Sequence, residues 1–262
     1  MGKLISIVFF IAQALLSGDY PLKNGKPTSE GIELYVEQNW NSLLQEYQAY
    51  VGDTIYNVWF YTSDQKQPGS TEPMELGWFF PHEIYISTEE LFHAYELDDL
   101  SPKQREKLGE SNRFVRGVMI HELTHEYVSQ IGVEMKSVHH LHVDKSYETN
   151  ILIVSSCETF GSSFIEEGLS EYMTEKMGQL IPPVQIDIPA SLEDLLDRKH
   201  LYQVRYKYAS AYLETFLDNT GFKEGVQILL HNPPPSYEEI LHPDLFFDRL
   251  VVPDIPVAIS TY

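Results

Sequence analysis

The chain has 262 residues, of which 43% are hydrophobic and 22% are charged. This composition can bury a core, which argues against wholesale disorder, and the length suits one large domain or two small ones. The formal net charge is −21, and so acidic a surface argues against nucleic acid and anionic membranes as partners. A single cysteine, Cys157, leaves any metal site to His and carboxylate ligands.

The N-terminus begins with an apolar stretch from Leu4 to Leu16 that follows a single lysine. The stretch is shorter than the roughly 20 residues that a membrane-spanning helix needs, so we expect no stable membrane span. Ala12-Gln13-Ala14 has the small-x-small form of a signal-peptidase site. We therefore expect residues 1–14 to be a signal peptide, residues 15–262 to form a single domain, and the protein to be secreted or periplasmic. The alternative is a buried N-terminal helix.

The segments up to residue 132 predict helices around a small sheet. Apolar residues at spacings of three and four indicate a helix over 32–50, and β-branched and aromatic residues indicate strands over 54–62 and 77–87. A capping-box pattern at Ser87 starts another helix. A long helix is expected from Asn112 to Ile131, with Gly132 ending it.

The remainder of the chain is mainly helical by the same criteria. Residues 133–161 are irregular, and helices are expected over 163–177, 203–219 and 221–231, with a further capping box at Ser236. The predicted fold class is therefore α+β. A small N-terminal mixed sheet with an edge strand would lie above a mainly helical lower subdomain, with the active-site helix between them.

The long helix carries the motif His121-Glu122-Leu123-Thr124-His125. Residues four apart on a helix share a face, so the two imidazoles can bind one metal ion, and Glu122 lies beside it to take a proton from water. Two His nitrogens, a carboxylate and an open position form a catalytic zinc site. Most residues before His121 are apolar, as a buried active-site helix requires, namely Phe114, Val115, Val118, Met119 and Ile120.

A third ligand must come from elsewhere. Val128 and Ile131 stand where metzincins have a glycine and a third histidine, which excludes that class. Downstream, residues 164–172 read FIEEGLSEY on a predicted helix. Here the sequence resembles the gluzincin metallopeptidases, which include thermolysin and the aminopeptidase N family. The resemblance implies a zincin-like fold, one Zn²⁺ per chain and Glu167 as the third ligand.

The same resemblance gives Glu171, one turn after Glu167, the role of orienting a zinc-bound histidine, while Glu166 is expected to face solvent. The 41 residues between His125 and Glu167 depart from the family, because the gap is much longer than in thermolysin or aminopeptidase N. This insertion offers rival metal ligands, which are His139, His140, His142 and Asp144.

Two further features complete the expected site. Tyr208, which stands before an alanine at the start of an apolar helix, resembles the tyrosine that stabilises the oxyanion in aminopeptidase N. The alternative is that Tyr208 simply packs that helix. Residues 83–87 are the candidate for the edge strand to which a peptide substrate would add.

These features together predict a zinc metallopeptidase with Glu122 as the general base and a peptide or protein as its substrate. Three alternatives stay open at this point. One is a zinc hydrolase of a non-peptide substrate, and another is a catalytically inactive peptidase fold that serves as a binding module. The third is a coincidental motif that binds no metal.

Overall fold

The computed structural model describes much of the chain, namely residues 22–23, 26–27, 29–64, 77–80, 82–88, 113–135, 160–178, 188–197 and 203–253. The chain divides into two compact units. The first unit comprises residues 1–50, 54–126 and 173–182, and the second comprises residues 51–53, 127–172 and 183–262. Residues 1–14, Cys157 and the loop that holds His139, His140, His142 and Asp144 lie outside the described residues.

The first unit begins with the short strands β1 (Leu22–Lys23) and β2 (Lys26–Pro27), which pair antiparallel, and continues with helix α2 (Ser29–Val51). The helix forms where the sequence places apolar residues at spacings of three and four, and this stripe is buried. Its buried members within the unit are Ile32, Val36, Leu43 and Tyr47. The sequence prediction of this helix is confirmed.

A three-stranded mixed sheet follows. Its strands are β3 (Trp59–Ser63), β4 (Gly77–Phe80) and β5 (Glu83–Ser87), in the order β3-β5-β4. Strand β5 pairs parallel with β3 and antiparallel with β4. The expectation that residues 83–87 form the edge strand is therefore wrong, because β5 is the central strand, and β4 and β3 are the edges among the strands that the structure describes. The position of β5 between two neighbouring strands agrees with the burial of its side chains Ile84 and Ile86.

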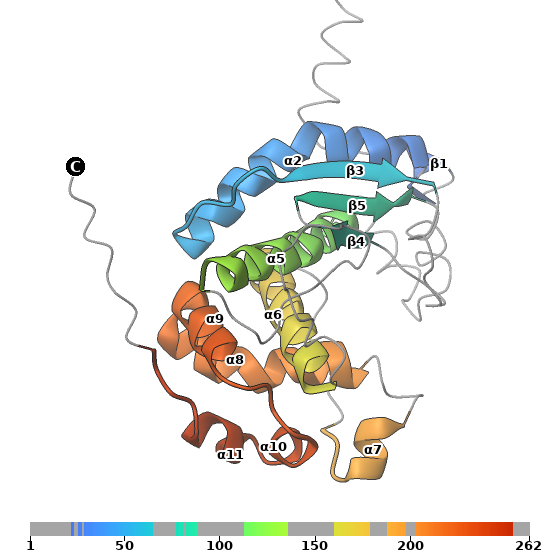
Figure 1. Cartoon of the computed structure of the whole chain (residues 1–262). Helices are drawn as coiled ribbons and strands as arrows, with labels where there is room; N and C mark the ends of the chain where they lie inside the picture. The colour runs from blue at the N-terminus through green and yellow to red at the C-terminus, as the bar shows by residue number, and fades with distance from the viewer. Residues whose placement is uncertain are drawn as a thin grey trace, which may run out of the picture. The chain divides into compact units, whose positions relative to one another are not determined.

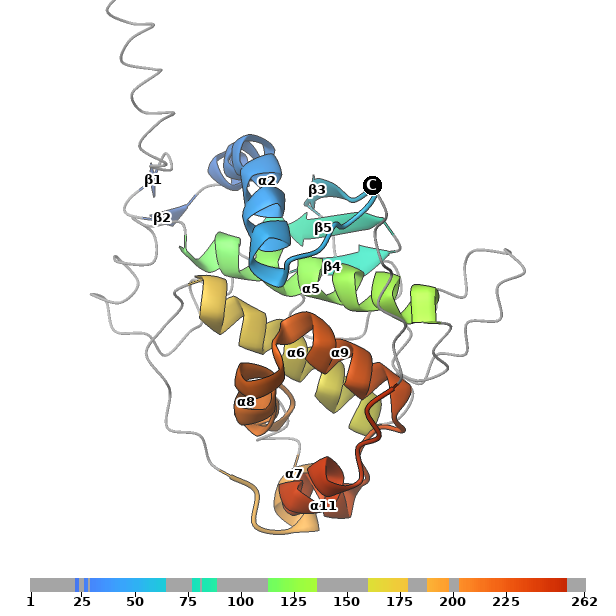
Figure 2. The ribbon, with the colours of Figure 1, turned by 90° about the vertical axis from the view of Figure 1, so that its left-hand side faces the viewer.

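Helix α5 (Arg113–Met135) carries the His-Glu-x-x-His motif and lies beside the sheet, with β4 as the nearest strand in both Figure 1 and Figure 2. The Tyr47 hydroxyl of α2 donates to Thr124 Oγ1 at 3.0 Å, which ties the middle of α5 to α2. The helix runs through Gly132, so the prediction that this glycine ends it is wrong. Gly132 is buried, and a glycine costs only about 1 kcal/mol inside a helix, which packing can offset.

The second unit is built from helices around an aromatic core. Helix α6 (Phe160–Gly178) starts in this unit, and both α5 and α6 contribute residues to both units. The Phe164 ring of α6 packs against Tyr208 and Tyr212, and Tyr212 packs against Phe246. The elements that follow α6 are α7 (Leu192–Leu196), the π-helix η2 (Gln203–Tyr208), α8 (Ala209–Thr220), α9 (Phe222–His231), α10 (Tyr237–Leu241) and α11 (Pro243–Asp248).

The described residues are thus mainly helical with a small sheet, which is compatible with the predicted α+β class. No helix among them is long and apolar enough to cross a membrane.

Candidate metal centre

His121 and His125 are held on one face of α5 by their spacing of four residues. Their Nε2 atoms lie 3.2 Å apart, and the two ring planes meet at 73°. Metal–nitrogen bonds of about 2.0–2.1 Å in tetrahedral geometry place two ligand atoms about 3.3 Å apart. The two nitrogens therefore already have the separation that one tetrahedral metal ion requires.

Glu122 lies between the histidines in sequence and is only 7% exposed. Its neighbour is Gly77, the first residue of the edge strand β4. A Cβ atom at Gly77 would lie 2.9 Å from Glu122 Cγ and 3.1 Å from Glu122 Oε1. The missing side chain at Gly77 is therefore what makes room for the Glu122 carboxylate beside the strand.

A second carboxylate, Glu126, fixes the same helix to the turn between β4 and β5. The backbone N–H of His82 donates to Glu126 Oε2 at 3.0 Å, and His82 Nδ1 lies 3.2 Å from Glu126 Oε1. His82 has a φ of +74°, a conformation that is uncommon outside glycine. The buried carboxylate holds this turn, and sequence reasoning missed it because residues 82 and 126 are 44 positions apart.

Glu167 lies on α6 and is half-buried. It is followed by Gly168, where an added Cβ would lie 2.9 Å from the carbonyl oxygen of Ala209 on α8. The glycine therefore lets α8 approach α6 closely beside the candidate ligand. One ligand atom from each of His121, His125 and Glu167 lies within 4.8 Å of the others, so that the group could hold a metal ion.

Glu171 is buried one turn after Glu167, and Lys207 of η2 donates to its Oε1 atom. Burial lowers the pKa of Lys207 to about 8, while the adjacent carboxylate favours the charged form of the amine. Lys207 is a charged partner that sequence reasoning missed. The orienting role expected for Glu171 stays a prediction. Glu166 is only 5% exposed, so the expectation that it faces solvent is wrong.

Tyr208 ends the π-helix and is buried. Its hydroxyl donates to the carbonyl oxygen of Ile240 at 2.7 Å, and its ring packs on Phe164 and Tyr212. Burial raises the pKa of its phenol. To stabilise an oxyanion, Tyr208 would have to give up this buried hydrogen bond. Its catalytic role stays a prediction, and the contacts favour the alternative that Tyr208 packs the helix.

Comparison with known proteins gives no relative. No family model, no curated protein and no solved structure matches the chain.

Proposed function

We propose that this protein is a zinc-dependent hydrolase of peptide bonds, with His121, His125 and Glu167 as the metal ligands and Glu122 as the general base. The observation that carries the proposal is the 3.2 Å separation of the two Nε2 atoms, with a buried carboxylate on the residue after His121. Nitrogen and carboxylate donors in this number suit zinc better than calcium or magnesium, which prefer oxygen ligands.

Zinc bound to these three residues would activate water as a nucleophile and polarise the substrate carbonyl. The carboxylate of Glu122 would take the proton from that water and pass it to the leaving amine. Glu122 is only 7% exposed, which would limit the exchange of this proton with bulk water. These roles require Glu122 to be ionised at the start of the reaction.

The sheet supports a peptide as the substrate. Strand β4 is an edge strand, and its first residue, Gly77, lies against Glu122. An extended peptide can add to such an edge through main-chain hydrogen bonds, which would bring a peptide bond close to the general base. In this proposal residues 77–80, rather than residues 83–87, form the edge strand to which a peptide substrate adds.

The first test is Glu122→Gln, assayed on a peptide library after removal of metal and reloading with one equivalent of zinc. We expect peptide hydrolysis to fall by at least about 10²-fold, because general-base catalysis contributes about 10²–10⁴. The zinc content should stay at one per chain. The matched control is Glu134→Gln, an exposed carboxylate on the same helix, which should keep full activity.

The ligand set is tested by Glu167→Ala, with bound zinc as the readout. Loss of zinc binding supports the His-His-Glu site. If the variant kept its zinc at wild-type affinity, the third ligand would have to come from the loop with His139, His140 and His142. Cleavage of small esters but not peptides by the reloaded wild type would point to a non-peptide substrate instead.

A further inference from the structure

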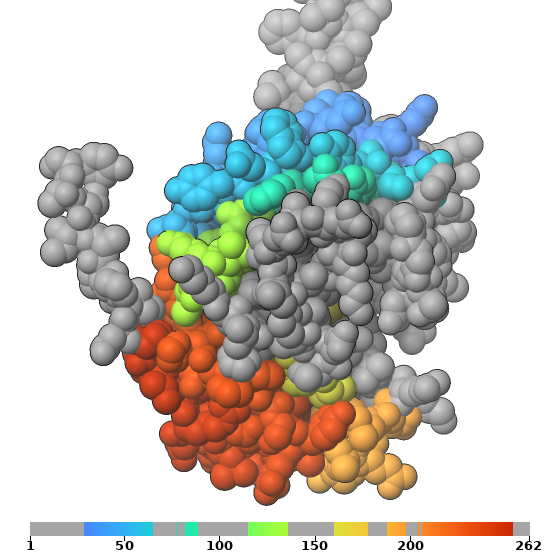
Figure 3. Space-filling view, in the orientation of Figure 1, coloured from blue at the N-terminus to red at the C-terminus, as the bar shows by residue number. Residues whose placement is uncertain are grey.

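A pocket of about 720 Å³ opens on the second unit, well away in sequence from the His-Glu-x-x-His motif. It lies between α8 and the pair α10–α11, whose residues are coloured orange to red on the surface in Figure 3. A volume of this size is within the range of sites for small molecules, about 300–1,000 Å³. Its aromatic lining residues are Tyr208, Tyr212, Phe216 and Phe247.

The hydroxyl groups of the two tyrosines already donate to backbone carbonyl oxygens. The Tyr208 hydroxyl donates to the Ile240 carbonyl oxygen, and the Tyr212 hydroxyl donates to the Glu239 carbonyl oxygen at 3.1 Å. Both hydroxyls are thereby committed to the backbone of α10. The partly exposed aromatic rings of the lining belong to Phe216 and Phe247, and the negatively polarised faces of such rings attract cations.

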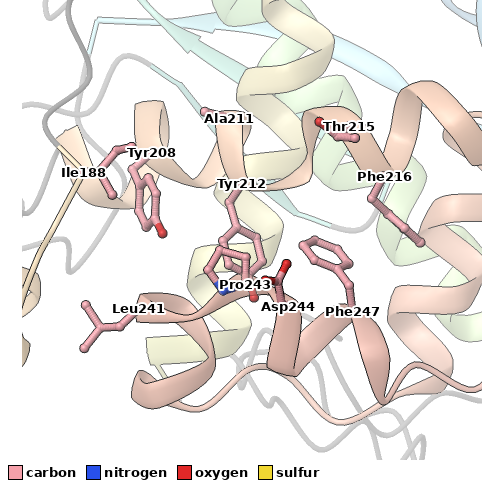
Figure 4. Close-up of a pocket in the computed structure, with 10 residues that line it drawn as sticks. All are labelled: Ile188, Tyr208, Ala211, Tyr212, Thr215, Phe216, Leu241, Pro243, Asp244 and Phe247. Carbon is pink, nitrogen blue, oxygen red and sulfur yellow. The ribbon is translucent and has the colours of Figure 1, made fainter.

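One charged side chain, Asp244, is among the ten described residues that line the pocket, and no basic residue is. Figure 4 shows Asp244 on α11 among these lining residues, and its side chain is exposed. No described residue forms an ion pair or hydrogen bond with this carboxylate. The nearby cation Arg249 is instead held by Glu239 and by the Phe246 ring.

We propose that this pocket binds an organic cation, either an alkylammonium or a guanidinium group on an apolar body. Aromatic faces would hold the cation by cation–π attraction, and Asp244 would supply the opposite charge. The net charge of −21 would raise the local concentration of such ligands. The ligand could be a free amine or a basic side chain of a peptide, since both present the same chemistry.

The experiment is calorimetric titration of the full-length, metal-free protein with matched charged and neutral probes. Benzyltrimethylammonium is compared with benzyl alcohol, and N-acetylarginine amide with N-acetylcitrulline amide, which has nearly the same shape without the charge. We expect each charged probe that binds to do so at least about fivefold more tightly than its neutral partner. Binding of the arginine derivative identifies a peptide side chain as the source, and binding of the quaternary amine alone identifies a small molecule.

Asp244→Asn should weaken the binding of the charged probe about tenfold and leave the neutral probe unchanged, and Phe247→Leu should weaken the charged probe as well. The matched control is Asp248→Asn, one turn along the same helix and not among the lining residues, which should bind as the wild type does. Equal affinity for the charged and neutral probes, or wild-type affinity in Asp244→Asn, would overturn the proposal. So would the absence of any binding at about 10 mM probe. Because zinc is not needed, failure here is separable from failure of the hydrolase proposal.

Discussion

Gly77 and Glu122 meet at a distance that leaves no room for even one methyl group. An added Cβ would also lie 3.0 Å from the carbonyl oxygen of Tyr85 on the neighbouring strand. This oxygen belongs to the backbone of a paired strand, so it cannot rotate aside as a side chain can. Gly77→Ala should therefore displace the Glu122 carboxylate. We expect peptide hydrolysis to fall at least about tenfold, since a shift of 1 Å in a catalytic group can cost about 10²-fold.

Zinc content and the rate of hydrolysis per folded molecule separate this effect from simple destabilisation. The metal should remain, because neither histidine is touched. Gly225→Ala is the matched control, because it places the same methyl group 2.6 Å from the Leu217 side chain in the second unit. That variant should lose stability and keep its activity. Unchanged activity in Gly77→Ala would contradict this prediction, because the Glu122 carboxylate would then work equally well after its displacement.

Tyr208 gives a second prediction for a single residue. Tyr208→Phe removes a buried hydrogen bond to the Ile240 carbonyl, which should lower the free energy of unfolding by about 1–2 kcal/mol in urea titrations. If Tyr208 only packs the core, turnover per folded molecule stays at the wild-type level. A fall of about 10²-fold in turnover would restore the oxyanion role to this residue.

Two helices are held to each other by the ion pair between Lys207 of η2 and Glu171 of α6. Lys207→Met would leave the buried carboxylate of Glu171 without this partner, and we expect a loss of about 1–3 kcal/mol in the free energy of unfolding. The double variant Lys207→Met/Glu171→Leu should recover most of that loss, because no unpaired charge remains. Additive losses in the double variant would mean that the pair carries no coupling energy.

Helix α10 should be sensitive to acid. Hydrogen bonds from the Arg249 guanidinium lower the pKa of Glu239 to about 2, and Glu239 also closes the capping box with Ser236. A carboxyl whose pKa is depressed on folding stabilises above its unfolded pKa of about 4.3, and this stability is lost as the pH falls towards 2. Solvent screens the pair, so the expected contribution is about 1–2 kcal/mol rather than the full value of the shift.

The measurement is urea unfolding at pH 6 and at pH 3 for Glu239→Gln and for the exposed neighbour Glu238→Gln. Glu239→Gln should be destabilised at pH 6 and should lose less further stability at pH 3 than the wild type does. Glu238→Gln should follow the wild type at both values. If the two variants behaved alike, the pair of Glu239 with Arg249 would make no measurable contribution to the free energy of unfolding.

The helices were more accessible to sequence reasoning than the strands. Helices α2 and α6 follow their apolar periodicity closely, and the capping box at Ser236 was predicted from two residues three positions apart. Strand order depends on which segments pair across a long separation, and no local pattern records that. The central position of β5 was therefore missed, and β3 begins at Trp59 rather than at residue 54.

The same limit applies to the candidate metal centre. The local part of the motif predicted the convergence of His121 and His125, because one helical turn suffices. The partners of Glu126, Glu171 and Glu122 lie on other elements, at His82, Lys207 and Gly77. Each of these contacts depends on tertiary packing, so a single sequence gave no signal for them.

At the scale of the whole molecule, the proposed metal would link binding to stability. A ligand that binds only the folded state stabilises it by about 2.7 kcal/mol at a hundredfold excess over its Kd. We expect zinc to raise the Tm of the metal-free protein by several degrees, and His125→Ala to abolish that rise. A Tm rise of equal size in the variant would assign the effect to another site.

The π-helix η2 lies directly before α8. The number of residues in η2 therefore sets how far the preceding chain is rotated about the helix axis relative to α8. A π-turn commonly accommodates one residue more than an α-turn would. Deleting one residue from this turn and restoring an α-helix would rotate everything before it by about 100° relative to α8. A deletion at Arg205 would keep both Lys207 and Glu171. It would nevertheless move the residues before the deletion to a different face of the helix, where they would meet different neighbours. The length of this segment is therefore as much a constraint on variation of the chain as the identity of its residues.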